Sequence, residues 1–146
     1  MSRKQSRETA FKLLFSLCFG AEIQTNIEDV TDEKIDEREL EYINRLCAAV
    51  RENLAAVDAV IERHAHGFAL DRLFKIDLTV LRMAAVEILY LCEVTPPVVA
   101  VNEAVVIAKK YGTEKSAGYI NGILASVMKD SPSRGEGVDA EGGRGS

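Results

Sequence analysis

The sequence lacks the short motifs that mark common catalytic and cofactor sites. It has no glycine-rich phosphate loop, because Gly118 and Gly122 fall inside an expected helix with no strand before it. The two histidines, His64 and His66, are two residues apart, whereas a helical metal-binding pair needs a spacing of three or four. No serine or cysteine stands in a recognisable nucleophile motif. We therefore expect a binding protein, not an enzyme, with no metal and no cofactor.

Cysteine is scarce, and no long apolar run is present. Cys18, Cys47 and Cys92 are an odd number, each lies among apolar residues, and no pair has metal-ligand spacing. This pattern is typical of buried free thiols in a reducing compartment. The most apolar stretch, residues 78–92, is interrupted by charged side chains and is too short to span a bilayer. Because the amino terminus also has no hydrophobic targeting core, we expect a soluble, cytoplasmic protein that does not bind membranes.

Only three prolines occur, and no long window alternates polar and apolar residues as a half-buried strand would. Apolar residues recur instead at helical spacing, which predicts an all-α single domain of six to seven helices. The expected helices cover about residues 3–19, 40–61, 77–92, 98–111 and 116–128, with a short turn at 70–74. The expected boundary signals are a capping box of Ser2 and Gln5, a stop at Gly20, N-caps at Asp77 and Ser116, and Pro97 in a first turn.

Two segments have distinctive apolar patterns. Steps of three and four residues alternate along Leu40, Ile43, Cys47, Val50, Leu54, Val57 and Ile61, which predicts one long helix or two nearly collinear ones. Their single stripe suits a coiled-coil dimer or a bundle face within the chain, and we favour the bundle because the other helices also need apolar partners. Residues 77–92 are apolar on nearly every side, which predicts a buried central helix.

Charge is unevenly distributed along a chain whose net charge is −5. Residues 1–16 contain four basic residues and one acidic residue, whereas residues 22–41 contain nine acidic residues and two basic ones. This asymmetry indicates separate faces for separate partners. The last residues are rich in glycine, serine and charge, so we expect a folded domain at 1–129 and a disordered tail at 130–146.

Cationic and aromatic residues occur together near both ends of the expected domain. Arg3, Arg7, Phe11 and Phe15 recur every four residues and form one row on the first helix. Cations in such a row can neutralise phosphates, and an aromatic ring can stack on an unpaired base. Phe11 and Phe15 could instead pack in the core. A second group, Lys109, Lys110, Tyr111, Gly112, Lys115 and Ser116, lies at the elbow between the last two helices.

Four blocks of the sequence carry a resemblance to a known family. They are Arg7-Glu8 leading into Ala10, Leu14 and Phe15; Phe68-Ala-Leu-Asp-Arg-Leu; Leu81-Arg82-Met83-Ala84 with Glu87; and Val101-Asn102-Glu103-Ala104 with Ala108-Lys109, Tyr111-Gly112, Ser116 and Asn121-Gly122. Over about residues 3–128 the chain resembles the NusB family of bacterial transcription antitermination factors. The resemblance implies two small helical bundles packed together and no catalysis. It also implies binding of boxA-type single-stranded RNA with ribosomal protein NusE, in a complex that keeps RNA polymerase elongating on ribosomal RNA operons.

The patterns and the resemblance together assign residues to two surfaces. The expected RNA surface comprises Arg3, Lys4, Arg7, Lys12, Phe15, Tyr111, Gly112, Lys115, Ser116 and Tyr119. The expected NusE-facing surface comprises Asp71, Leu73, Phe74 and Asp77, whose acidic groups complement a basic ribosomal protein. Two other interpretations stay open: a dimerisation module without an RNA role, and an accessory RNA-binding domain of a ribosomal RNA cytosine methyltransferase. A monomer and a homodimer are both compatible with the sequence.

Overall fold

The computed structural model describes residues 1–20 and 26–130. These residues form six α-helices and no strand, which confirms the expected all-α fold. The helices are α1 (Arg3–Leu14), α2 (Glu37–Glu52), α3 (Leu54–His64), α4 (Lys75–Tyr90), α5 (Pro97–Tyr111) and α6 (Ser116–Asp130). Short 3₁₀ turns lie at Phe15–Phe19, Ile27–Asp29 and Leu70–Arg72. The expected tail lies outside the described residues except for Asp130, which ends α6.

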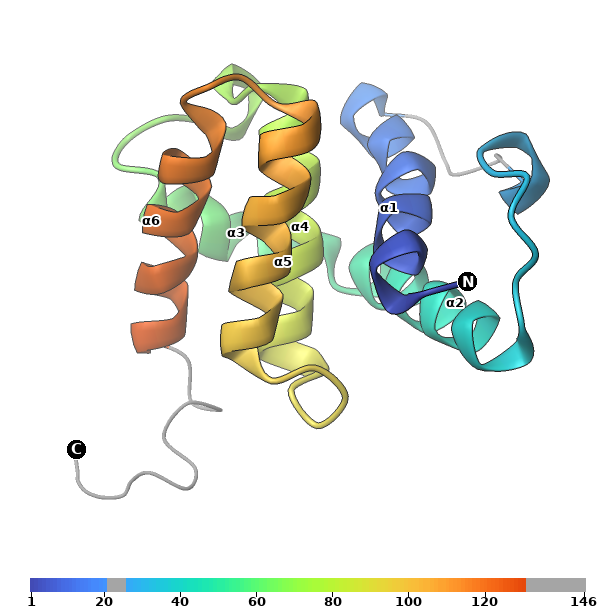
Figure 1. Cartoon of the computed structure of the whole chain (residues 1–146). Helices are drawn as coiled ribbons and strands as arrows, with labels where there is room; N and C mark the ends of the chain where they lie inside the picture. The colour runs from blue at the N-terminus through green and yellow to red at the C-terminus, as the bar shows by residue number, and fades with distance from the viewer. Residues whose placement is uncertain (21–25, 131–146) are drawn as a thin grey trace.

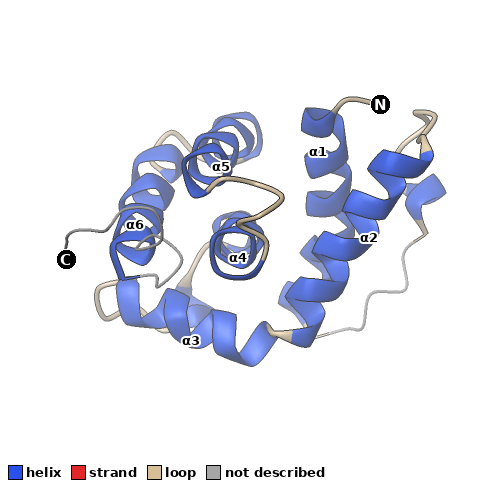
Figure 2. Ribbon diagram, turned by 90° about the horizontal axis from the view of Figure 1, so that it is seen from below, coloured by secondary structure: helices blue, strands red, loops and turns tan. Residues whose placement is uncertain are grey.

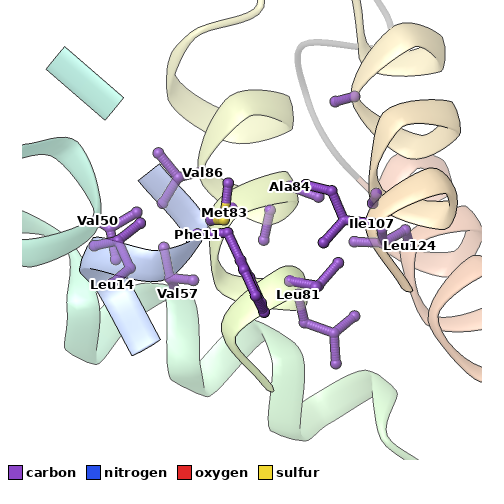
Figure 3. Close-up of a cluster of buried hydrophobic side chains, with 14 of the residues drawn as sticks. Phe11, Leu14, Val50, Val57, Leu81, Met83, Ala84, Val86, Ile107 and Leu124 are labelled. Carbon is purple, nitrogen blue, oxygen red and sulfur yellow. The ribbon is translucent and has the colours of Figure 1, made fainter. Parts of the chain in front are cut away.

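Helix α4 occupies the centre of the molecule, and the other five helices surround it when it is seen end-on (Figure 2). Helices α3, α5 and α6 pack with α4 into one bundle, and α1 with α2 forms a second unit against it (Figure 1). Every α4 residue from Asp77 to Ile88 is buried, as its all-round apolar pattern predicts. The core contains Leu81 and Ala84 of α4, Ile107 of α5, Leu124 of α6, and Phe11 and Leu14 of α1 (Figure 3).

Local signals set both ends of the first helix. The Ser2 hydroxyl accepts a hydrogen bond from the Gln5 amide at 3.1 Å, and the Gln5 side chain accepts one from the Ser2 amide at 2.8 Å. This is the predicted capping box. The helix tightens into a 3₁₀ turn after Leu14 and does not stay α-helical to residue 19. Gly20 then ends it with a φ of +75°, a left-handed conformation that favours glycine.

The expectation of a single or nearly collinear helix over residues 40–61 is wrong. Asn53 has non-helical backbone angles and separates α2 from α3, and the chain changes direction there (Figure 2). Its side-chain amide donates to the Ala49 carbonyl at 2.8 Å, in competition with its backbone amide at 3.1 Å. Most of the apolar stripe is nevertheless buried within the chain, namely Ile43, Cys47, Val50, Val57 and Ile61. The bundle interpretation of this stripe is therefore confirmed.

Two predicted N-caps are also wrong. Helix α4 begins at Lys75 after Phe74, so Asp77 lies inside the first turn and is buried. Helix α6 begins at Ser116 itself. Its capping contacts come from Thr113, whose hydroxyl accepts from the Lys115 amide at 3.2 Å and whose amide donates to the Ser116 hydroxyl at 2.9 Å. A polar residue near a helix start thus marks the start only to within a turn.

Candidate nucleic-acid interface

The first helix lies beside the carboxyl-terminal half of α5. Glu8 accepts hydrogen bonds from the Lys110 ammonium and the Tyr111 hydroxyl, each at 2.9 Å. The rings of Phe11 and Tyr111 are 5.1 Å apart between centroids. These contacts join α1 to the elbow. The RNA surface expected from the sequence combines residues of these two segments, so it requires them to lie side by side. We call Lys4, Lys12, Phe15, Lys110 and Tyr111 the basic-aromatic face.

An apolar hollow opens on this face, and we call it the aromatic hollow. Its volume is about 280 Å³, and it is lined by Phe11, Lys12, Phe15, Ile76 and Tyr111. Phe11 is buried and packs as a core residue, whereas Phe15 is half-buried and borders the hollow. Aromatic walls beside an exposed ammonium suit an unpaired base, since stacking needs a ring face and tolerates any base.

A second hollow of about 270 Å³, the polar hollow, adjoins the first. It is lined by Lys4, Gln5, Glu8, Thr9, Lys12, Thr31, Glu33 and Lys110. Lys12 lines both hollows, so a base site and a cationic site meet at this residue. The side chains of Lys4 and Lys110 are 57% and 58% exposed, and their ammonium groups are paired with Glu103 and Glu8 respectively. The pair of hollows has the layout of a site for a nucleotide, with a place for the base next to a place for the backbone.

Arg7 does not belong to this face. It is only 5% exposed, and its guanidinium contacts the Glu87 carboxylate at 3.2 Å inside the molecule. Glu87 also accepts hydrogen bonds from the Tyr42 hydroxyl at 2.8 Å and the Thr95 hydroxyl at 2.9 Å. The burial corrects the expectation that Arg7 contacts RNA, because the network ties α1 to α2, α4 and the loop after α4.

Arg3 lies at the edge of the face and is partly engaged elsewhere. Its guanidinium makes two hydrogen bonds, of 2.8 and 3.2 Å, to the Glu39 carboxylate on α2 and lies 4.0 Å from the centroid of the Tyr42 ring. Hydrogen bonds from Arg3 and Ser6 lower the pKa of Glu39, so this partner stays ionised. Lys4 points instead towards Glu103 on α5, at a looser 3.7 Å. The lysine is therefore the freer of the two cations.

The elbow residues divide into shape-giving and exposed ones. A Cβ on Gly112 would lie 2.5 Å from the Ser116 hydroxyl oxygen and 2.8 Å from the Ala108 carbonyl oxygen, so only glycine fits. Ser116 is 1% exposed and holds the turn by its bond from Thr113. Lys115 is exposed, and Tyr119 is half-buried. Gly112 and Ser116 thus shape the elbow, and Lys115 is an exposed cation on it, as are Lys109 and Lys110.

The four residues expected to face NusE are also divided. Asp71 and Phe74 are exposed, whereas Leu73 and Asp77 are buried. Burial raises the pKa of Asp77, and the nearby Ser116 side chain only partly offsets this. Within residues 1–20 and 26–130, the Asp77 Oδ1 atom and the Tyr119 hydroxyl have no hydrogen-bond partner. The accessible part of this surface is therefore Asp71 and Phe74.

Comparison with known proteins decides the family. The model of the NusB family matches residues 4–129. The chain belongs to the NusB family. The transcription antitermination protein NusB of Clostridium novyi is 38% identical over 133 residues, covering 88% of this chain and 99% of that protein. The corresponding protein of Ruminiclostridium cellulolyticum is 43% identical over 135 residues, covering 88% of this chain and 90% of that protein.

Solved structures of the NusB family agree with the fold. The structure of Thermotoga maritima NusB has a TM-score of 0.81 and 34% identity, covering 90% of this chain and 93% of that chain. A structure of the antitermination factors NusB and NusE in complex with dsRNA has a TM-score of 0.76 and 27% identity, covering 87% of this chain and 96% of that chain. The relatives are named for a role in transcription, and a member of this family is not an enzyme. None of the helices described here has both the length and the apolar character needed to cross a membrane.

Sequence reasoning misses Glu8, Ile76 and Lys110 as parts of this NusB-family interface. Lys110 stands in the cationic junction that the sequence displays, beside an equally basic Lys109. Glu8 pairs with a residue 102 positions away, and no local pattern indicates such a contact. Ile76 enters the aromatic hollow from the start of α4, which packs against α1 only in the folded chain.

Proposed function

We propose that this NusB-family chain is a transcription antitermination factor that binds boxA-type single-stranded RNA together with ribosomal protein NusE. The complex keeps RNA polymerase elongating through ribosomal RNA operons, and work on nascent RNA puts the protein in the cytoplasm. Membership of the family supports the antitermination role. The observation that carries the proposal of RNA binding is that the aromatic hollow and the polar hollow meet at Lys12.

The basic-aromatic face binds RNA by stacking one base and neutralising the phosphates beside it. The base enters the aromatic hollow between Phe15 and Tyr111, and the backbone follows Lys4, Lys12 and Lys110. An unpaired base can enter such a hollow, whereas a base in a duplex would first have to leave its stack. With Lys115 as a fourth cation, the logarithm of affinity falls with the logarithm of salt at a slope of about −3.

NusE binds a different part of the surface, at the turn before α4. Asp71 supplies a negative charge there and Phe74 an exposed apolar ring that is 47% accessible. A carboxylate at the rim speeds encounter with a basic protein, while an aromatic anchor slows its dissociation. Leu73 and Asp77 support this turn from within. The related structure of NusB and NusE in complex with dsRNA supports NusE and an RNA as partners, and the single-stranded form of that RNA is part of our proposal.

Two observations weigh against the alternative functions. The apolar stripe that favours a dimerisation module is mostly buried inside the chain, so it offers no seam to a second copy. The Clostridium novyi and Ruminiclostridium cellulolyticum relatives are named transcription antitermination proteins, and this favours an antitermination factor over an accessory domain of a methyltransferase.

The test is a titration of fluorescent boxA-type RNA with the whole chain, alone and with purified NusE. Scrambled RNA of the same length and a duplex form of the boxA-type RNA are the comparison ligands. We expect the single-stranded boxA-type RNA to bind most tightly, and NusE to tighten it further. Lys12→Ala should weaken binding, whereas Arg63→Ala, on the exposed side of α3, removes the same charge and should not. Equal affinities for all three RNAs with NusE present would contradict the proposal.

A further inference from the structure

The polar hollow already contains an anion, and that anion is part of the chain. Lys110 donates to both carboxylate oxygens of Glu8, at 2.9 and 3.1 Å. The Tyr111 hydroxyl donates to one of the same oxygens at 2.9 Å. The Glu8 side chain is 19% exposed, while the Lys110 side chain is 58% exposed. The carboxylate therefore lies at the bottom of the hollow with its donors around it.

The electrostatics keep this carboxylate charged. Burial alone would raise the pKa of Glu8, but the hydrogen bonds from Lys110 and Tyr111 and the nearby Lys12 charge outweigh burial and lower it. The hydrogen bond to Glu8 likewise raises the pKa of Lys110. An ammonium and a hydroxyl that donate to one anion, with a second ammonium in the same hollow, are also what a phosphate needs. The donors that suit an RNA phosphate are thus engaged by the protein itself.

We propose that Glu8 is a built-in competitor of the RNA phosphate and so limits how tightly the chain binds RNA. The inference rests on the proposed function and adds a residue to it. When a strand binds, a phosphate takes Lys110 and Tyr111 from Glu8, so each backbone contact gains less than it would at a free lysine. The same phosphate contact is made by every RNA sequence, so Glu8 lowers the affinity for all of them.

A second carboxylate supports this interpretation. Glu33 lines the same hollow from the segment before α2 and is exposed. The hollow therefore sets two carboxylates against the ammonium groups of Lys4, Lys12 and Lys110. Each carboxylate lowers the net positive charge that a phosphate meets in this hollow, so Glu33 acts in the same direction as Glu8.

The experiment compares Glu8→Gln with Glu93→Gln in the whole chain. Both remove one negative charge, but Glu93 pairs with the exposed Arg45 and lines neither hollow. For Glu8→Gln we expect affinity for boxA-type and scrambled RNA to rise by roughly three- to tenfold at low salt, as for loss of one nearby like charge. The salt slope should steepen by about 0.7, which is one further phosphate contact on a single strand. The preference for boxA-type over scrambled RNA should stay unchanged, because both RNAs make the same phosphate contact, and Glu93→Gln should change neither the affinity nor the salt slope.

A second comparison identifies the cation involved. In a Lys110→Met background the gain from Glu8→Gln should be clearly smaller, because the ammonium that Glu8 occupies is gone and only Tyr111 and the repulsion between like charges remain. An undiminished gain there, or a Glu8→Gln variant that binds no more tightly than the unmodified chain, overturns the inference and makes Glu8 a residue that positions Lys110. Melting followed by circular dichroism checks the fold, and Glu8→Ala gives the same test if the glutamine variant does not fold. If the unmodified chain and all variants fail to bind RNA, the proposed function fails with it.

Discussion

Arg7 and Lys4 are three residues apart on α1 but have opposite environments. Arg7 is buried against Glu87, whereas the Lys4 side chain is 57% exposed and only loosely paired with Glu103. Removing one partner of a buried ion pair leaves an uncompensated charge in the interior, while an exposed pair contributes little. Two basic residues of one segment therefore have different tasks, one in folding and one in binding.

Replacement of Arg7 tests this difference at the level of stability. We expect Arg7→Ala to lower the free energy of unfolding by about 3–5 kcal/mol, because Glu87 would stay buried without its cation. Lys4→Ala, the matched control, should change it by less than about 0.5 kcal/mol. Urea denaturation followed by circular dichroism measures both. Similar losses in the two variants would show that the Arg7 pair is not the buried support described above.

Asp77 gives a prediction about pH. Burial raises the pKa of Asp77 in the folded chain above its value in the unfolded chain. The unfolded chain therefore loses this proton at a lower pH than the folded chain does. As a result, the stability of the fold falls as pH rises through the range between the two pKa values. Asp77→Asn removes this contribution and should raise the melting temperature at pH 7. The gain in melting temperature should vanish at a pH below the folded and unfolded pKa values of Asp77, because its carboxyl group is then protonated in the folded and in the unfolded chain. Thermal melts of the two proteins across pH 3–7 check the sign, and a loss at pH 7 would contradict it.

At the scale of elements, the elbow between α5 and α6 depends on one glycine. A methyl group at Gly112 would overlap Ser116 and the Ala108 carbonyl, so the two helices would have to move apart. We expect Gly112→Ala to cost about 1–3 kcal/mol of stability, as overpacking does, and to weaken RNA binding with it. Gly118→Ala is the control, since nothing lies within 4 Å of its new Cβ and alanine favours a helix. If Gly112→Ala melted at the same temperature as Gly118→Ala, the tight elbow would be refuted.

Helix α4 is the central helix, against which the other helices pack. Leu81 is fully buried at its centre, whereas Leu40 on α2 is 37% exposed. Leu81→Ala should therefore lower the free energy of unfolding by about 2–5 kcal/mol, and Leu40→Ala by far less. Chemical denaturation of both variants measures the difference. A loss below about 0.5 kcal/mol for Leu81→Ala would mean that α4 is not the central helix.

The elements show how far local patterns predict this fold. Ser2, Gln5 and Pro97 marked helix starts correctly because their signals involve only neighbouring residues. The break at Asn53 was missed because the apolar spacing continues through it, and the side chain that competes for the Ala49 carbonyl leaves that spacing unchanged. Asp77 resembled a cap because it is polar, but its place inside the first turn follows from how the preceding turn packs.

At the scale of the whole molecule, the candidate site depends on long-range pairs. The sequence indicated a cationic helix start and a cationic elbow, and the structure brings them together through Glu8 and Lys110. The sequence could not indicate that Arg7 turns inwards, because its partner Glu87 is 80 positions away on α4. Local patterns thus indicated the two segments that meet in the candidate interface, whereas tertiary packing decides which of their side chains reach solvent.

The central claim is that α1 and the elbow form one RNA-binding face, and photo-crosslinking tests it most directly. The complex of the whole chain with NusE and 4-thiouridine-substituted boxA-type RNA would be irradiated, and the linked residues identified by mass spectrometry. We predict crosslinks at Phe15 and Tyr111. Phe68, which is 55% exposed outside both hollows, serves as an internal control and should stay unlinked. Crosslinks at Phe68 or along the outer sides of α3 and α6, with none at Phe15 or Tyr111, would contradict the account.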